Sequence, residues 1–126
     1  MQLATLASQL IRLAQAAKVG AQNRLPRAYN PAMPLASVNG RKVYYESHGA
    51  TSGTPLVLVM GMGGSCKGWL PLQVPEFAQH HRTLIYDNRG VGESEDPGDP
   101  FTTADLADDL AALLHELGIT RAHVLG

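Results

Sequence analysis

Residues 56–65, LVLVMGMGGS, and residues 83–94, TLIYDNRGVGES, each pass from a largely apolar run directly into a loop that contains glycines. Runs without polar alternation are typical of strands that are buried on both faces of a parallel sheet. Glycines directly after such a strand indicate a sharp turn or a close approach of the backbone to a ligand. The two stretches therefore predict buried strands over 56–60 and 82–86, each followed by a loop that could carry function.

Helical patterns follow both strands, and a third apolar run closes the chain. Residues 72–80 predict a helix. Thr102 and Asp105 have the spacing of a capping box, which predicts that a second helix begins there and ends near Gly118. Residues 122–126 predict another buried strand. The apolar stripe of the second helix is Leu106, Leu110, Leu113 and Leu117, and the acids expected on its solvated face are Asp105, Asp108, Asp109 and Glu116.

The part of the chain before residue 56 has a different character. The Asn39-Gly40 dipeptide tolerates positive φ at both central positions of a type I′ turn, so it predicts an antiparallel hairpin of strands 35–38 and 41–46. Residues 1–20 have the spacing of an amphipathic helix, and residues 21–35 contain three prolines and predict a linker. We therefore expect an α/β domain over residues 36–126, in which the hairpin precedes parallel strands joined by right-handed crossover helices.

Composition excludes several classes of protein. Hydrophobic residues at 44% and charged residues at 17% are typical of a globular chain, and no apolar run approaches the roughly 18 residues of a membrane span. A single cysteine, Cys66, excludes an internal disulfide and favours the cytoplasm. The basic residues of the first 45 positions are too dispersed for a nucleic-acid site, although an acid-free helix over 1–20 leaves mitochondrial targeting or a membrane-surface anchor open.

The two glycine-bearing stretches and the final strand together resemble the α/β-hydrolase fold family. Met60-Gly61-Met62-Gly63-Gly64-Ser65 is similar to the family's His-Gly-x-x-Gly loop, with Met60 in place of the histidine. Asp87-Asn88-Arg89-Gly90-Val91-Gly92-Glu93-Ser94 is similar to its D-x-R-G-x-G-x-S segment. The resemblance covers residues 36–126 and implies that Gly126 is the first glycine of the G-x-S-x-G turn, so that the sequence stops just before the nucleophile.

The resemblance implies roles for residues in this sequence. The backbone N–H of Met62 is expected to donate to an oxyanion, and Gly61, Gly63 and Trp69 are expected to contact substrate. A larger set is expected to build the loops and turns of the site: Asp87, Arg89, Gly90, Gly92 and Gly126. The whole protein is expected to hydrolyse a small ester, lactone or related bond without a metal or organic cofactor, whereas this stretch alone lacks nucleophile, acid and base and should be inactive.

Other interpretations of the same residues stay open. Gly61, Gly63 and Asp87 are arranged much as in a dinucleotide-binding fingerprint, but Cys66 stands where the third glycine should be. A non-catalytic interaction protein built on the hydrolase scaffold is a second alternative, because fold does not fix function. Ser65, Ser94 and Cys66 lack the neighbours of a nucleophile. The sequence does not reveal the oligomeric state or the identity of the small-molecule substrate.

Overall fold

The structure, a computed structural model, describes residues 35–126, so the helix and linker predicted before Leu35 lie outside the described residues. Five strands form one sheet in the order β1-β2-β4-β3-β5. The strands are β1 (Leu35–Val38), β2 (Arg41–Gly49), β3 (Leu56–Leu58), β4 (Arg82–Tyr86) and β5 (His123–Leu125). The helices are the 3₁₀ helix η1 (Cys66–Trp69), α2 (Gln73–Phe77) and α3 (Thr103–Glu116).

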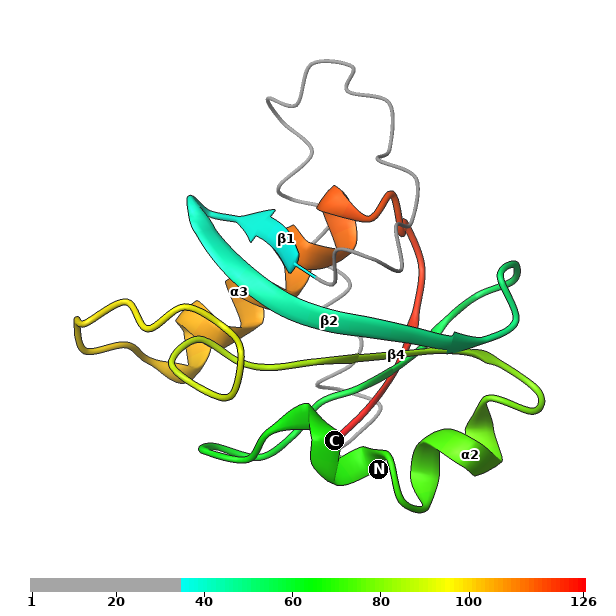
Figure 1. Ribbon diagram of the computed structural model, residues 1–126. Coiled ribbons are helices and arrows are strands. Elements are labelled where there is room, and N and C mark those ends of the chain that lie inside the picture. The colour runs from blue at the N-terminus through cyan, green and yellow to red at the C-terminus, as the bar shows by residue number, and fades with distance from the viewer. Residues whose placement is uncertain (1–34) are drawn as a thin grey trace.

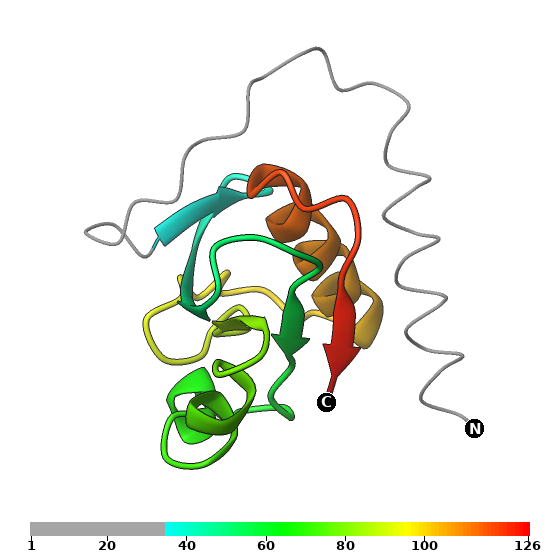
Figure 2. The ribbon, with the colours of Figure 1, turned by 90° about the vertical axis from the view of Figure 1, so that its right-hand side faces the viewer.

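The pairing of the strands confirms the predicted fold class. β1, β2 and β4 pair antiparallel, whereas β4, β3 and β5 run parallel to one another. η1 and α2 connect β3 to β4, and α3 connects β4 to β5. Because the carboxyl ends of parallel strands meet at one edge of a sheet, the loops after β3 and β4 and the end of β5 lie together (Figures 1 and 2).

The sheet is covered on both faces, and each face has its own core. On one face Leu110 and Leu113 of α3 pack against strand residues that include Val57 and Leu84. On the other face Cys66 of η1 and Val74 of α2 pack against Leu58 and Ile85. Leu58 and Ile85 each follow Val57 and Leu84 by one residue, so their side chains point to the opposite face of the sheet. Within residues 35–126, no helix has the length and apolarity needed to cross a membrane.

The hairpin and the cap of α3 form as predicted. Asn39 and Gly40 have φ values of 49° and 79°, as a type I′ turn requires. The Thr102 hydroxyl accepts from the Asp105 N–H at 3.3 Å, and the Asp105 carboxylate accepts from the Thr102 N–H at 2.6 Å. The hydrogen bonds from Thr102 lower the pKa of Asp105. Both signals are local in sequence, so a single sequence was enough to find them.

The boundaries of four elements differ from the prediction. β5 covers His123–Leu125 instead of 122–126, and its residues are exposed or half-buried although a buried strand was predicted. β2 extends to Gly49 instead of Glu46, because its second half pairs with β4 after its first half has paired with β1. β3 ends at Leu58 instead of Met60, although the Val59 N–H still donates to the Leu125 carbonyl at 2.7 Å. The helix predicted over 72–80 is limited to α2, five residues long, with turns at both ends.

Candidate active site

The glycine loop, residues 61–64, follows β3 as a tight turn. The Gly64 N–H donates to the Gly61 carbonyl at 3.1 Å, and Gly63 has a φ of 79°. Positive φ at only the third residue is typical of a type II turn, a conformation that a residue with a side chain strongly disfavours at that position. The Met62 side chain is 78% exposed, and among residues 35–126 no group accepts a hydrogen bond from its N–H. The turn therefore presents an unpaired backbone donor at the carboxyl edge of the sheet.

The Met60 side chain packs against the backbone of the glycine loop at Gly64 and against Gly68 of η1. A Cβ placed on Gly64 would lie 2.5 Å from Met60 Cγ, and one on Gly68 would lie 2.8 Å from Met60 Cε. The thioether therefore occupies the space that side chains at these two positions would need. Close packing of the methionine side chain therefore restrains the start of the loop.

Asp87 connects the glycine loop to the loop after β4. It is fully buried, and its Oδ1 accepts from the Ser65 hydroxyl at 3.0 Å and from the Cys66 N–H at 2.7 Å. Its Oδ2 accepts from the Glu93 N–H at 3.0 Å. A carboxylate held by three internal donors is a structural anchor and leaves little capacity for a ribose hydroxyl, which disfavours the dinucleotide interpretation.

Gly92 has no room for a side chain. A Cβ there would lie 2.1 Å from Asp87 Oδ2, and its φ is 55°. We expect Gly92→Ala to lower the free energy of unfolding by about 2–5 kcal/mol, because it adds backbone strain and displaces a buried carboxylate. Gly98→Ala is the matched control, since Gly98 also has positive φ (71°) but faces open space. Urea denaturation measures the free energy of unfolding of both variants. Gly98→Ala reports backbone strain alone, whereas Gly92→Ala reports strain and the clash with Asp87. Equal losses of unfolding free energy in the two variants would contradict the packing described for Asp87.

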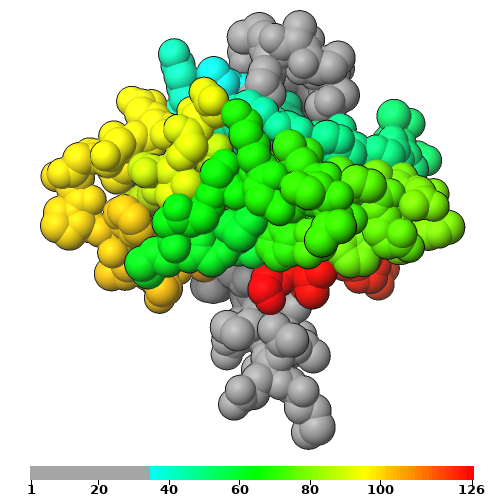
Figure 3. Space-filling model, turned by 60° about the horizontal axis from the view of Figure 1, so that its bottom comes forward, coloured from blue at the N-terminus to red at the C-terminus, as the bar shows by residue number. Residues whose placement is uncertain are grey.

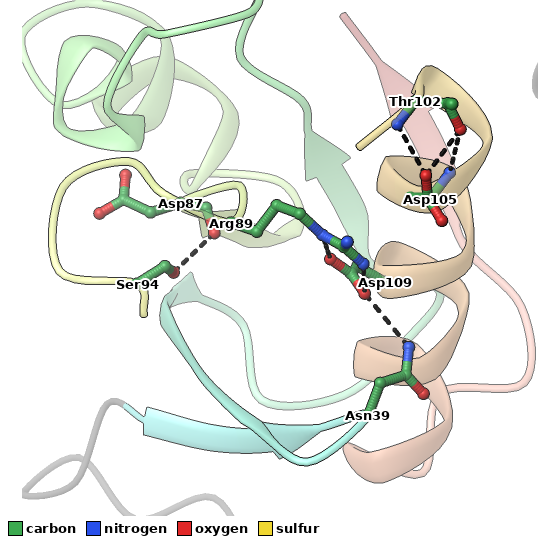
Figure 4. Close-up of polar contacts among 7 residues, drawn as sticks. All are labelled: Asn39, Asp87, Arg89, Ser94, Thr102, Asp105 and Asp109. Atoms are coloured by element: carbon green, nitrogen blue, oxygen red, sulfur yellow. Dashed lines mark hydrogen bonds and ion pairs between the residues drawn. The ribbon is translucent and has the colours of Figure 1, made fainter. Parts of the chain in front are cut away.

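Arg89 forms a buried ion pair with Asp109 of α3 (Figure 4). Its Nε donates to Asp109 Oδ2 at 2.6 Å and its Nη2 to Oδ1 at 2.8 Å, and Asn39 of the hairpin turn donates to Oδ1 at 3.1 Å. The guanidinium carbon lies 5.6 Å from the centroid of the Phe101 ring. The bonds to Asp109 raise the pKa of Arg89. One carboxylate thus connects the hairpin, the loop after β4 and α3.

The prediction that Asp109 lies on the solvated face of its helix was wrong. Asp109 is only 6% exposed, and its carboxylate can be buried because the buried guanidinium of Arg89 is paired with it. A signal was present in the sequence: position 109 falls three residues after Leu106 and four before Leu113, within the apolar stripe. An acid at such a position needs a cationic partner, but the helical pattern does not say which cation supplies it.

The hydroxyls of Ser65 and Ser94 are engaged in hydrogen bonds, and the thiol of Cys66 is buried. The Ser94 hydroxyl donates to the Asp87 carbonyl at 2.7 Å and accepts from the Tyr44 N–H at 2.9 Å. The Ser65 hydroxyl caps η1, accepting from the Lys67 N–H at 3.3 Å while it donates to Asp87. Cys66 has no exposed surface, and burial, followed by its hydrogen bond to Asp87, raises the pKa of the thiol. None of the three has the exposure or basic partner of a nucleophile.

The raised pKa values predict loss of stability at alkaline pH. Burial raises the pKa of Cys66 above its ordinary value of 9.0 and that of Tyr86 above 10.0. A pKa raised by folding stabilises the protein fully below the unfolded value, and this contribution is lost as pH rises above it. We therefore expect the free energy of unfolding to fall above pH 9, and the native Cys66 thiol to resist a disulfide reagent at pH 8. Rapid thiol labelling of folded protein would contradict the burial of Cys66.

Trp69 lies in η1, partly buried against the core that contains Cys66 and Val74. Its indole Nε1 is buried and has no hydrogen-bond partner among the described residues. The ring therefore packs against this core, and a contact between Trp69 and substrate stays a prediction. Nor do residues 35–126 bring together three His, Cys, Asp or Glu side chains that could hold a metal ion.

Gly126 lies against Val59, two residues before the glycine loop. A Cβ on Gly126 would lie 3.1 Å from the Val59 carbonyl oxygen and 3.3 Å from Val59 Cβ. Leu125 and Leu58 are in register in the parallel pair of β5 and β3. Figure 3 shows the end of β5, in red, beside the green segment that carries the loop, η1 and α2. The end of β5 is therefore immediately beside the backbone that leads to Met62.

Comparison with known proteins gives consistent matches. A family model described as alpha/beta hydrolase fold matches residues 54–126. The enol-lactonase from Burkholderia xenovorans LB400 is 38% identical with a TM-score of 0.68, over 72% of this chain and 35% of that chain. Est816, described as an N-acyl homoserine lactone degrading enzyme, is 32% identical with a TM-score of 0.66, over 74% of this chain and 35% of that chain.

A curated relative agrees with these structures. The candidate carbamate hydrolase RutD of Azorhizobium caulinodans is 39% identical over 94 residues, which are 75% of this chain and 34% of that protein. The chain thus spans about a third of the length of the relatives it matches. The family model covers more than half of the chain. The chain belongs to the alpha/beta hydrolase fold family.

Proposed function

We propose that the chain is the N-terminal part of an enzyme that hydrolyses a small ester, lactone or related bond. The nucleophile lies two residues beyond Gly126, on the sharp turn that follows β5. The Met62 N–H is one donor of the oxyanion hole, and the N–H of the residue after the nucleophile is the other. The acid and the base lie further along the protein, so residues 1–126 alone are inactive.

The position of Gly126 carries this proposal. A Cβ added to Gly126 would lie 3.1 Å from the carbonyl oxygen of Val59, the residue before Met60. A side chain at this position would be in tight contact with Val59. A nucleophile that follows shortly after Gly126 therefore comes close to the turn whose Met62 N–H is unpaired.

The chemistry follows from this arrangement. The base takes the proton of the nucleophilic hydroxyl, the oxygen bonds to the carbonyl carbon, and the carbonyl electron pair moves onto its oxygen. The Met62 N–H stabilises that oxyanion, a contribution of about 3–4 kcal/mol for one donor in a preorganised site. The tetrahedral intermediate collapses, the alcohol leaves with the proton held by the base, and water releases the acyl group by the same steps.

The relatives support a carbonyl substrate. The names of the two lactone-acting structures and of the carbamate hydrolase all describe cleavage next to a carbonyl group. A serine is the nucleophile suited to such acyl transfer. Within residues 35–126 neither Ser65 nor Ser94 can serve, since both hydroxyls are engaged with Asp87.

The proposal is tested by assaying the full-length protein and residues 1–126 separately. The substrates are p-nitrophenyl butyrate and an unsubstituted small lactone. We expect hydrolysis by the full-length protein, and a rate for residues 1–126 that equals the buffer blank. A full-length protein inert towards both substrates, or a fragment as active as the whole, would contradict the proposed function.

A further inference from the structure

The glycine loop is fastened at both ends by two consecutive residues of the loop after β4. At its exit, Asp87 Oδ1 accepts from the Ser65 hydroxyl and from the Cys66 N–H, at 3.0 and 2.7 Å. At its entry, the side-chain amide of Asn88 donates to the Met60 carbonyl at 3.3 Å. The segment between these anchors contains three glycines, so it has little conformational restraint of its own.

Asn88 is itself held rigidly. It is 6% exposed, and its carbonyl accepts from the Val91 N–H at 3.1 Å. The preceding Asp87 N–H donates to the Tyr44 carbonyl on β2 at 3.0 Å, which fixes the backbone from which the amide projects. The Asn88 side chain can therefore restrain the Met60 carbonyl instead of following its movements.

We propose that Asn88 is a positioning residue for the oxyanion hole. By holding the Met60 carbonyl it fixes the plane of the Met60–Gly61 peptide, and this narrows the range of directions that the Met62 N–H, one peptide further on, can take. Asn88 touches neither substrate nor nucleophile, so its catalytic effect rests on the proposed function. Its restraint of the loop does not, and the two can be measured separately.

The variants are Asn88→Ala, which removes the amide, and Asn88→Asp, which keeps its shape but loses the donor to Met60. Asn39→Gly is the matched control. It also removes one amide hydrogen bond, to Asp109 at 3.1 Å, but it lies in the hairpin turn, where a φ of 49° suits glycine. A loss of activity that merely follows lost stability would appear in all three variants.

In the full-length protein we expect Asn88→Ala and Asn88→Asp to lower kcat for p-nitrophenyl butyrate about tenfold with KM unchanged. The affinity for a trifluoromethyl ketone, which forms a bound oxyanion, should weaken by the same factor as kcat/KM. Asn39→Gly should keep the kcat and the inhibitor affinity of the wild type. Equal kcat in Asn88→Ala and Asn39→Gly, or inhibitor affinity unchanged while kcat falls, would overturn the proposal.

Hydrogen exchange tests the restraint without catalysis. Peptides covering residues 60–65 should exchange faster in both Asn88 variants than in the wild type or in Asn39→Gly, because the loop loses its anchor at Met60. Unchanged exchange in both Asn88 variants would overturn the proposal even in an active enzyme. If the wild type hydrolyses neither substrate, the proposed function fails, and exchange alone decides the role of Asn88.

Discussion

Replacing Asp109 by Ala is expected to lower the free energy of unfolding by about 3–5 kcal/mol, because it leaves the buried Arg89 guanidinium without its counter-ion. The two side chains are 9% and 8% exposed, and their bidentate contact has distances of 2.6 and 2.8 Å. The Asn39 amide would lose its acceptor as well. The loss should therefore exceed that of any exposed ion pair, such as Lys67 with Glu93.

Urea denaturation of the full-length protein measures this loss, and a double variant provides the control. Arg89→Met with Asp109→Leu removes both charges together, so it should cost less than Asp109→Ala alone. If Asp109→Ala lowers the free energy of unfolding by less than about 1 kcal/mol, the ion pair is exposed to solvent. If the double variant loses as much unfolding free energy as Arg89→Met and Asp109→Leu lose separately when added together, the two charges are not coupled.

Replacing Met62 by Pro is expected to lower kcat of the full-length enzyme by about 10²–10³-fold, the effect of removing one oxyanion donor. Proline removes the backbone N–H and little else at this position. Met62 is the second residue of the turn closed by the Gly64 N–H and the Gly61 carbonyl, a place that proline favours in type II turns. The side chain is exposed, so its loss disturbs no core.

The comparison variant is Met62→Ala, which keeps the N–H but loses the same exposed side chain. The ratio of kcat between the Ala and Pro variants isolates the donor, and a melting temperature close to that of the wild type would show that the turn survives. If Met62→Pro hydrolyses p-nitrophenyl butyrate as fast as Met62→Ala, the Met62 N–H does not stabilise the oxyanion.

The sequence predicted those elements whose signals are local. The Asn39-Gly40 hairpin, the Thr102–Asp105 capping box and the order of strands and loops all rest on neighbouring residues or on periodicity, and all are present in the structure. The ends of β2 and β3 were missed because they depend on which strand pairs with which, and that is a property of the sheet. The fold could therefore be predicted, whereas several of its boundaries could not.

The candidate site was predictable only in part, and for a related reason. Glycines after buried strands identified both loops, but the side-chain contacts that connect these loops to each other and to α3 join residues 20 or more positions apart. The Asn88 amide on the Met60 carbonyl is one, and the Arg89–Asp109 pair is another. Nothing in the neighbourhood of Asn88 or Asp109 in the sequence names these partners, because they are brought together by the parallel pairing of β3 and β4 and by the packing of α3.

Covalent trapping tests the central claim most directly. The full-length enzyme is inactivated with a fluorophosphonate, which forms an adduct with an activated serine, and the labelled residue is found by mass spectrometry of its peptides. The account predicts a single adduct on the second residue after Gly126, formed at a rate that falls in Met62→Pro. An adduct on Ser65 or Ser94, or an enzyme that hydrolyses esters without any adduct beside Gly126, would contradict it.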